Sequence, residues 1–178
     1  MLKEITTVNA PITENITEEL TERPQWVCWR IEQRSSDDKP TKVPYTPGTE
    51  RRASSTDLMT WTPFDEAVTA YEATEPDAPE YHGIGFVFSG ADPFVGIDLD
   101  DCRDPETGEI TEWAAKIIER VQDGYIEISP SGTGIHVIVE GTVRGNRSRK
   151  KVRVDEKVVG QVEMYGRDRF FTITGRAL

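Results

Sequence analysis

Two acidic residues, spaced two apart in an otherwise apolar segment, are the first candidates for chemistry. In residues 95–100 (VGIDLD), strand alternation would place Asp98 and Asp100 on one face and the apolar side chains on the other. Residues i and i+2 lie roughly 6.7 Å apart along a strand, a gap that two carboxylates can close around divalent cations about 3.5–4 Å apart. Hard oxygen ligands favour Mg²⁺ or Mn²⁺. A solvated acidic loop is the alternative, so further features must decide.

A third carboxylate comes from a later segment of the chain. In residues 158–165 (VVGQVEMY), alternation places Gln161, Glu163 and Tyr165 on one face. A single Glu in a strand is more often solvent-facing. A two-metal phosphoryl-transfer site, however, needs a further carboxylate to hold its cations against a triphosphate. Asp98, Asp100 and Glu163 are therefore the candidate metal ligands and catalytic residues.

A glycine-rich turn lies between these acidic segments, at residues 129–136 (SPSGTGIH). The backbone N–H groups and the hydroxyls of Ser131 and Thr133 could cradle phosphate oxygens. His136 alternates with apolar neighbours, so it should project from the polar face, either as a ligand or as a half-buried, hydrogen-bonded histidine. The turn lacks the G-K-[ST] ending of a P-loop and the G-x-S-x-G frame of a nucleophile elbow.

Charge is distributed unevenly along the chain. The 32 acidic and 21 basic residues give a net charge of −11, the wrong sign for a general nucleic-acid binder, so any DNA contact must be local. Six bases gather in ten residues, as a site for phosphate backbone or as a solvated hairpin loop: Arg144, Arg147, Arg149, Lys150, Lys151 and Arg153. Acidity throughout the chain also suggests a source adapted to high salt.

Length and composition indicate a cytoplasmic protein with a single domain. The 178 residues fit a flexible lead-in over residues 1–16 and a single domain over residues 17–178. Cys28 and Cys102 lack a Cys-x-x-Cys pattern, and the two histidines lack zinc-ligand spacing. An EF-hand beginning at Asp98 is rejected because Arg103 stands where that loop needs glycine. We expect no membrane span and no signal peptide.

The N-terminal half contains signals for two helices and two strands. Thr17 should cap a short helix over residues 18–22, and residues 25–32 and 41–45 should be extended. Thr62 and Pro63 resemble the N-cap and first position of a helix that packs on a sheet.

Strands dominate the rest of the chain. One helix is predicted at residues 112–122, and strands at residues 84–88, 94–99, 125–129, 135–140, 158–165 and 169–174. This order predicts an α+β fold with helices on one face of a sheet, rather than a doubly wound parallel fold.

As an ordered set, these motifs resemble the archaeo-eukaryotic primase superfamily, and more narrowly the primase-polymerases of phages and plasmids. The resemblance covers residues 24–175 and rests on residues 96–100, the turn that ends in His136, and residues 162–165. Further support comes from residues 39–45 (KPTKVPY), 60–61, 84–88 (IGFVF), 127–136 and 169–175 (RFFTITG). It implies an N-terminal α/β unit and an RRM-like unit with mixed or antiparallel sheets and few helices, the active site lying between them.

The resemblance also implies roles for individual residues. Asp98, Asp100 and Glu163 would bind Mg²⁺ or Mn²⁺, and Ser131, Thr133, Gly134 and His136 would hold the incoming dNTP or NTP. Lys42 and Arg169 are further nucleotide contacts, while Arg147, Arg149, Lys150 and Lys151 would contact the single-stranded template and primer. The chemistry would be attack of a 3′-hydroxyl on the α-phosphate, in replication of a virus or plasmid, where a helicase is a further possible partner.

The chain departs from the family pattern in two places. Gly134 stands where the family's second motif has serine, two residues before the histidine. The chain also ends at Leu178, directly after the last motif strand, so this catalytic domain could be truncated. Two other functional classes stay open: a non-catalytic nucleic-acid-binding replication module, which would not need Glu163, and a two-metal nuclease, which would not need a triphosphate pocket.

Overall fold

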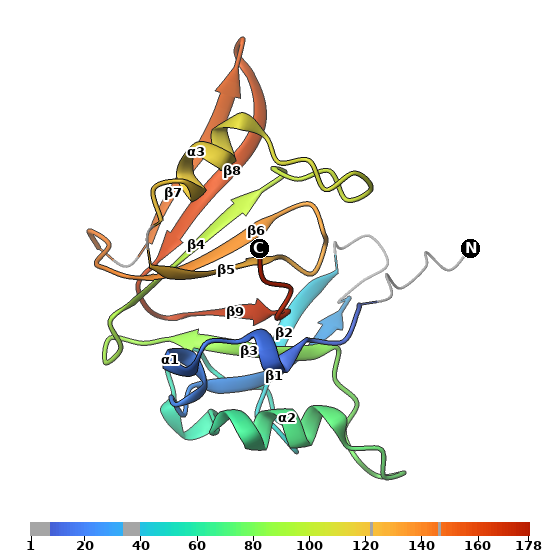
Figure 1. Cartoon of the computed structure of the whole chain (residues 1–178). Helices are drawn as coiled ribbons and strands as arrows, with labels where there is room; N and C mark the ends of the chain where they lie inside the picture. The colour runs from blue at the N-terminus through green and yellow to red at the C-terminus, as the bar shows by residue number, and fades with distance from the viewer. Residues whose placement is uncertain (1–7, 34–39, 122, 146) are drawn as a thin grey trace.

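The computed structural model describes residues 8–33, 40–121, 123–145 and 147–178, and the side chain of Arg147 lies outside this description. Within it, nine strands form two antiparallel sheets (Figure 1). The first sheet has the order β2-β1-β3-β9, with β1 Trp26–Glu32, β2 Thr41–Tyr45, β3 Gly83–Phe88 and β9 Arg169–Ile173. The second has the order β5-β6-β4-β8-β7, with β4 Phe94–Asp100, β5 Gly124–Ile128, β6 Ile135–Glu140, β7 Arg147–Val154 and β8 Lys157–Tyr165.

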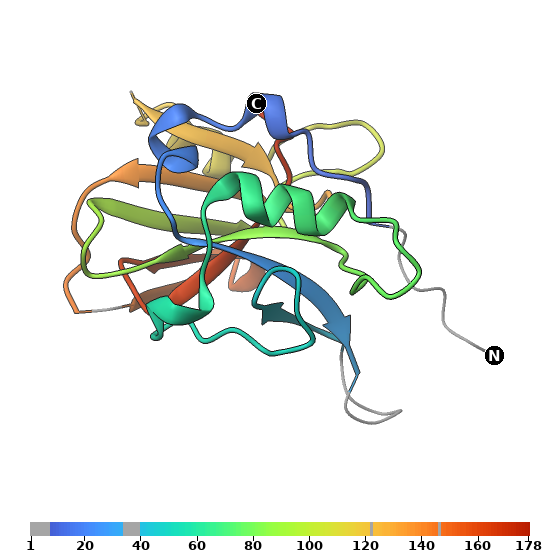
Figure 2. The ribbon, with the colours of Figure 1, turned by 90° about the horizontal axis from the view of Figure 1, so that it is seen from below.

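The described residues form three α-helices, α1 Glu18–Thr21, α2 Phe64–Glu72 and α3 Glu112–Ile118, and two 3₁₀ turns, η1 Thr13–Asn15 and η2 Leu58–Thr60. Helix α2 runs along β1 and β3, on the side of the molecule away from the second sheet (Figures 1 and 2). Helix α3 covers one face of the second sheet, close enough that a Cβ added at Gly160 of β8 would meet the Trp113 ring at 2.5 Å. The helices are thus divided between two sheets, which corrects the prediction of one sheet with helices on one face.

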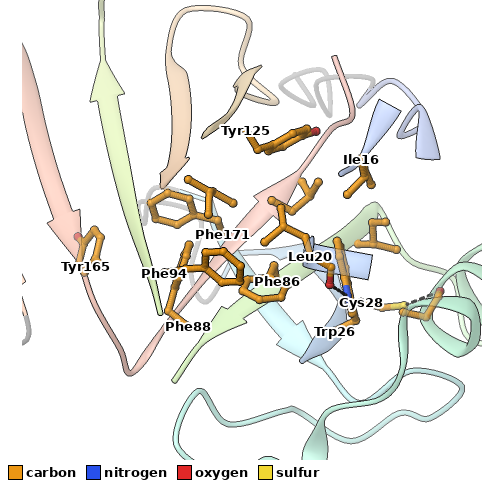
Figure 3. Close-up of a cluster of buried hydrophobic side chains, with 14 residues drawn as sticks. Ile16, Leu20, Trp26, Cys28, Phe86, Phe88, Phe94, Tyr125, Tyr165 and Phe171 are labelled. Carbon is orange, nitrogen blue, oxygen red and sulfur yellow. Dashed lines mark hydrogen bonds between the residues drawn. The ribbon is translucent and has the colours of Figure 1, made fainter. Parts of the chain in front are cut away.

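An aromatic core joins the two sheets (Figure 3). The rings of Phe86, Phe88 and Phe171, from the first sheet, make edge-on contacts with one another or with Phe94 of β4. Gly96 permits this approach, because a Cβ there would lie 2.5 Å from Phe88 and 2.8 Å from Phe171. The face of the second sheet that carries Gly96, Asp98 and Asp100 is therefore buried against the first sheet at its Gly96 end.

A second core lies between α3 and the opposite face of the second sheet. It contains the apolar residues that alternate with the candidate site residues: Val95, Ile97, Leu99, Ile135 and Val137. Burial of these side chains fixes which face each strand presents, because a shift of one residue in register would turn the whole apolar set outward. The same register therefore directs Asp98 and Asp100 away from this core.

Residues 12–15 and 174–178 are held by hydrogen bonds to distant parts of the chain. Ile12 N donates to Thr174 O at 2.9 Å, and the Asn15 side chain donates to Gly175 O at 2.9 Å. At the other end, Ile128 N donates to Arg176 O and Leu178 N donates to Ile126 O, so the last residues extend the edge of β5. The sequence predicted a flexible lead-in through residue 16, and these contacts of residues 12–16 were not part of that prediction. The predicted domain boundary itself stays a prediction.

Most predicted elements are confirmed, with three corrections. The helix expected at residues 112–122 ends at Ile118 and continues as turns, and Gln122 lies outside the described residues. The N-cap position of α2 belongs to Pro63 and not to Thr62, because the Thr62 backbone pairs with Trp26 in both directions. The basic segment considered as a solvated loop forms strand β7. Between the predicted strands at residues 25–32 and 41–45, residues 34–39 lie outside the described part of the chain.

Candidate active site

Strand register brings three of the candidate site residues into one row. Asp98 of β4 lies opposite His136 on β6 and opposite Glu163 on β8. The row continues outward to Glu127 on β5, which is paired with His136, and to Arg149 on β7, which is paired with Glu163. Paired residues of neighbouring antiparallel strands point to the same face of a sheet. We call these five residues the polar row; it crosses all five strands of the second sheet.

Asp100 lies on the next row, opposite Gln161 of β8. The Gln161 amide donates to Asp100 Oδ2 at 3.2 Å and to Glu163 Oε1 at 2.7 Å, so it links two of the three candidate ligands. The pKa of Asp100 is raised, first by burial and then by the negative charges of Asp98 and Glu163 and of Asp101. The surface around Asp98, Asp100 and Glu163 is therefore a region of crowded negative charge.

Glu163 is buried, with 4% of its surface exposed, and it forms an ion pair with Arg149 Nε. Within the described part of the chain, no group of three or more His, Cys, Asp and Glu side chains is arranged so that it could hold a metal ion. The three carboxylates thus share one face and neighbouring rows, but Glu163 is engaged by Arg149 and Gln161 instead of converging with the aspartates.

His136 is buried at the centre of the polar row, with 5% of its surface exposed. Its Nδ1 lies 3.0 Å from Glu127 Oε1, and its Nε2 lies 3.9 Å from Asp98 Oδ1. The Phe171 ring packs against the imidazole, with centroids 4.9 Å apart and planes inclined by 32°. The prediction that His136 projects from the polar face is confirmed by this position.

The glycine-rich turn carries a chain of hydroxyls next to the end of β4. Ser129 Oγ and Ser131 Oγ are 3.0 Å apart, and Ser131 Oγ and Thr133 Oγ1 are 2.9 Å apart. Gly132 has φ of 78°, a left-handed conformation that glycine adopts without strain. Thr133 O accepts hydrogen bonds from Cys102 N and Arg103 N, so the turn is fixed beside the segment that follows Asp100.

Gly134 stands where the family pattern has serine, and the structure shows what occupies that space. A Cβ at Gly134 would lie 2.9 Å from Leu99 O and 3.0 Å from Ser129 Oγ. Ser129 is buried, and its Oγ accepts a hydrogen bond from Gly134 N. A hydroxyl is thus present next to position 134, although it comes from Ser129 on the other side of the turn.

The first sheet contributes two cationic side chains near this face. Lys42 on β2 is exposed to solvent. Protein atoms nevertheless crowd around the side chain, and the resulting desolvation lowers its pKa. The nearby charge of Arg169 lowers that pKa further, while Asp98 and Asp100 act in the opposite direction. Arg169 lies over the Tyr165 ring, 4.8 Å from its centroid. Lys42 is therefore within electrostatic range of the acidic region, and Arg169 is within range of Lys42.

The candidate DNA contacts fall on two different faces. Arg149 and Lys151 of β7 are opposite Glu163 and Gln161, on the face of the polar row. Lys150 is opposite Val162, on the face that α3 covers. Arg147 begins β7, but its side chain is outside the described part of the structure.

Sequence reasoning assigned no functional role to three polar residues of this site: Glu127, Ser129 and Gln161. One signal was present, because Tyr125, Glu127 and Ser129 alternate with Ile126 and Ile128 in a short strand next to the glycine-rich turn. A charged residue that alternates with apolar ones is buried only if partners exist elsewhere in the fold. Those partners, Thr174 and Gly175, lie far away in sequence.

Comparison with known proteins decides the family. The chain is 38% identical over 154 residues, or 85% of its length, to a DNA primase-polymerase of Nitratiruptor phage NrS-1. This similarity confirms the primase-polymerase family that the motifs predicted. The chain spans about a fifth, 19%, of the length of this primase-polymerase. No family model matches the chain.

A phage primase-polymerase as relative fits the predicted virus or plasmid origin. No described helix is long and apolar enough to cross a membrane. The predicted cytoplasmic location and salt-adapted source stay predictions.

Proposed function

We propose that this chain is the catalytic domain of a primase-polymerase, a metal-dependent nucleotidyltransferase that extends or starts a primer on single-stranded DNA. The polar row is the observation that carries the proposal: three motifs far apart in sequence meet there through strand register, in a chain whose relative is named a DNA primase-polymerase. A binding module that had only kept the fold would have no use for Glu163 in this row.

Asp98, Asp100 and Glu163 would hold Mg²⁺ or Mn²⁺. Their chemistry fits, because hard oxygen donors share one face. Burial, followed by the charges of Asp98 and Glu163, raises the pKa of Asp100, so a cation would relieve the crowded negative charge. Glu163 must exchange its ion pair with Arg149 to take part. The bound cations would lower the pKa of the primer 3′-hydroxyl and stabilise negative charge on the departing pyrophosphate.

The triphosphate would lie along His136 and the glycine-rich turn. Ser131, Thr133 and Gly134 belong to this turn, which hydrogen bonds from Cys102 N and Arg103 N fix beside the segment that follows Asp100. This proximity to the carboxylates supports a phosphate-binding role for the turn. Lys42 and Arg169 would offset the remaining negative charge from the side of the first sheet. Positioning and charge neutralisation are the main contributions that a protein makes to phosphoryl transfer.

The template and primer would lie over the β7–β8 hairpin. Arg149 and Lys151 face the polar row, and they supply the local positive charge that an acidic chain needs for DNA. In this arrangement the first sheet with α2 would be the α/β unit of the family and the second sheet with α3 its RRM-like unit, with substrates between them. A helicase remains a possible further partner.

Primer extension tests the proposal. We expect the chain to add nucleotides to a primed single-stranded template with Mg²⁺ or Mn²⁺. Asp98→Asn should lower the rate by more than about a hundredfold, because loss of a group that only orients a metal ligand already costs roughly 10–100-fold. Asp101→Asn is the matched control: Asp101 is exposed, and asparagine tolerates its φ of 54°. Degradation of the template in place of extension would indicate a nuclease, and equal activity of both variants would refute the assignment.

A further inference from the structure

Glu127 is a fully buried carboxylate to which the proposed reaction assigns no role. None of its surface is exposed, although it lies in β5 at the end of the polar row. A charged group is tolerated in such a position only when its hydrogen-bonding capacity is satisfied. Its contacts therefore show what the fold uses it for.

The two oxygens of Glu127 have separate partners. Oε2 accepts hydrogen bonds from Tyr125 OH at 2.8 Å, Thr174 N at 2.8 Å and Gly175 N at 2.9 Å. These three donors come from β5 itself and from the segment that follows β9, so they fix the carboxylate between the two sheets. Oε1 is turned toward His136 Nδ1, 3.0 Å away.

This contact determines the state of the imidazole. An ionised carboxylate can only accept hydrogen bonds, so His136 Nδ1 must carry a proton and donate it to Glu127. The Phe171 ring on one side limits rotation of the imidazole. The other nitrogen, Nε2, then faces the site, 3.9 Å from Asp98 Oδ1.

We propose that Glu127 is a positioning residue that holds His136 with Nδ1 protonated and Nε2 directed toward the nucleotide. Glu127 touches no substrate and acts through His136 alone. The inference rests on the proposed function only for the statement that His136 contacts the nucleotide. The hydrogen-bond arrangement itself can be tested without any ligand.

His82 provides an internal reference of the opposite kind. Ile31 N donates to His82 Nδ1 at 3.3 Å, so the Nδ1 of that ring must be unprotonated. The chain has two histidines, and a His136→Gln variant assigns their signals. The two rings should therefore show opposite states in one spectrum.

The first measurement is the nitrogen NMR spectrum of [¹⁵N]histidine-labelled protein at neutral pH, without nucleotide. In the wild type we expect a protonated Nδ1 at His136 and an unprotonated one at His82. In Glu127→Gln, the amide oxygen can still accept from Thr174 and Gly175, which leaves the amide NH₂ facing His136. An amide NH₂ group donates hydrogen bonds, so the His136 Nδ1 that faces it should become an acceptor without a proton. An unprotonated His136 Nδ1 in the wild type would overturn the inference, even if the variant does not fold.

The second measurement is the affinity for a dNTP with Mn²⁺. We expect Glu127→Gln to weaken binding by roughly 10–100-fold, as is typical when a group that orients a ligand is removed. In a His136→Gln background the same change should have little further effect. Equal losses in both backgrounds would show that Glu127 acts only on the fold and would overturn the proposal.

Tyr125→Phe is the matched control. It removes one donor to Oε2 and leaves the Oε1 contact with His136 in place. We expect the His136 spectrum to keep its protonated Nδ1 and the dNTP affinity to change by less than about threefold, since the orienting contact remains. If the wild type binds no dNTP, the proposed function fails, while the spectrum still decides whether Glu127 orients His136.

Discussion

Asp100 shows how a residue proposed to bind a catalytic metal can weaken the fold that carries it. Its pKa is raised by burial and by the charges of Asp98 and Glu163, so ionisation is less favourable in the folded protein than in the unfolded chain. A carboxyl group of this kind stabilises the fold while it is protonated, and that contribution is lost as the pH rises through its raised pKa. At neutral pH without metal, Asp100 should therefore reduce stability.

We predict that Asp100→Asn is more stable than the wild type at neutral pH in EDTA, by about 1 kcal/mol or less because the group is half-exposed and screened. The difference should shrink below about pH 3.9, where Asp100 is protonated in both states. Added Mn²⁺ should stabilise the wild type more than the variant. Urea unfolding measures all three effects.

Asp101→Asn is the control for this prediction as well, because it removes a neighbouring exposed charge without removing a proposed ligand. A stability gain from Asp101→Asn as large as that from Asp100→Asn would mean that general negative charge, and not the buried position of Asp100, is responsible.

The sequence was sufficient for some residues of the site and insufficient for others. Strand alternation predicted the faces of Asp98, Asp100 and His136, because alternation is a local property. Gln161 was on the predicted face of its strand, but its bridge between Asp100 and Glu163 depends on cross-strand register, which one strand does not reveal.

At the scale of elements, β7 is the strand that could not be predicted from the sequence. Residues 147–154 (RSRKKVRV) lack apolar alternation, so nothing local distinguishes them from a solvated loop. Pairing with β8 makes them a strand, and the connecting residues Asp155 and Glu156 both have positive φ, which is typical of a type I′ hairpin turn. The hairpin sorts adjacent basic residues onto opposite faces.

Lys150 and Lys151 test this sorting, since they are neighbours of the same type on opposite faces. We predict that Lys151→Gln weakens binding of single-stranded DNA and lowers the magnitude of the salt-dependence slope by roughly 0.7, the value for one lost phosphate contact. Lys150→Gln should leave both quantities nearly unchanged. Fluorescence anisotropy with a labelled oligonucleotide over a range of salt concentrations measures them.

Equal effects of the two substitutions would show that DNA does not discriminate between the faces of the hairpin. The hairpin would then attract DNA through its total charge, as a flexible basic loop would, and the proposed path of the template over the polar row would be wrong.

At the scale of the whole molecule, the ends of the chain connect the two sheets. The segment after β9 donates to Glu127 through Thr174 N and Gly175 N, pairs with β5, and accepts hydrogen bonds from Ile12 N and the Asn15 side chain. No periodic pattern in the sequence predicts such contacts, because they join segments at opposite ends of the chain. The α+β class was predictable, whereas this closure was not.

Gly175 is the position at which this closure can be tested. Its φ is 65°, and an added Cβ would lie 2.0 Å from Ile12 O. We predict that Gly175→Ala destabilises the protein by about 1–3 kcal/mol more than Gly48→Ala, since overpacking has that typical effect. Gly48 is the matched control, with φ of 73° and nothing within 4 Å of its added Cβ, so it reports backbone strain alone. Urea unfolding compares them. Equal losses would mean that residues 12–16 move aside freely, as a flexible lead-in through residue 16 would do.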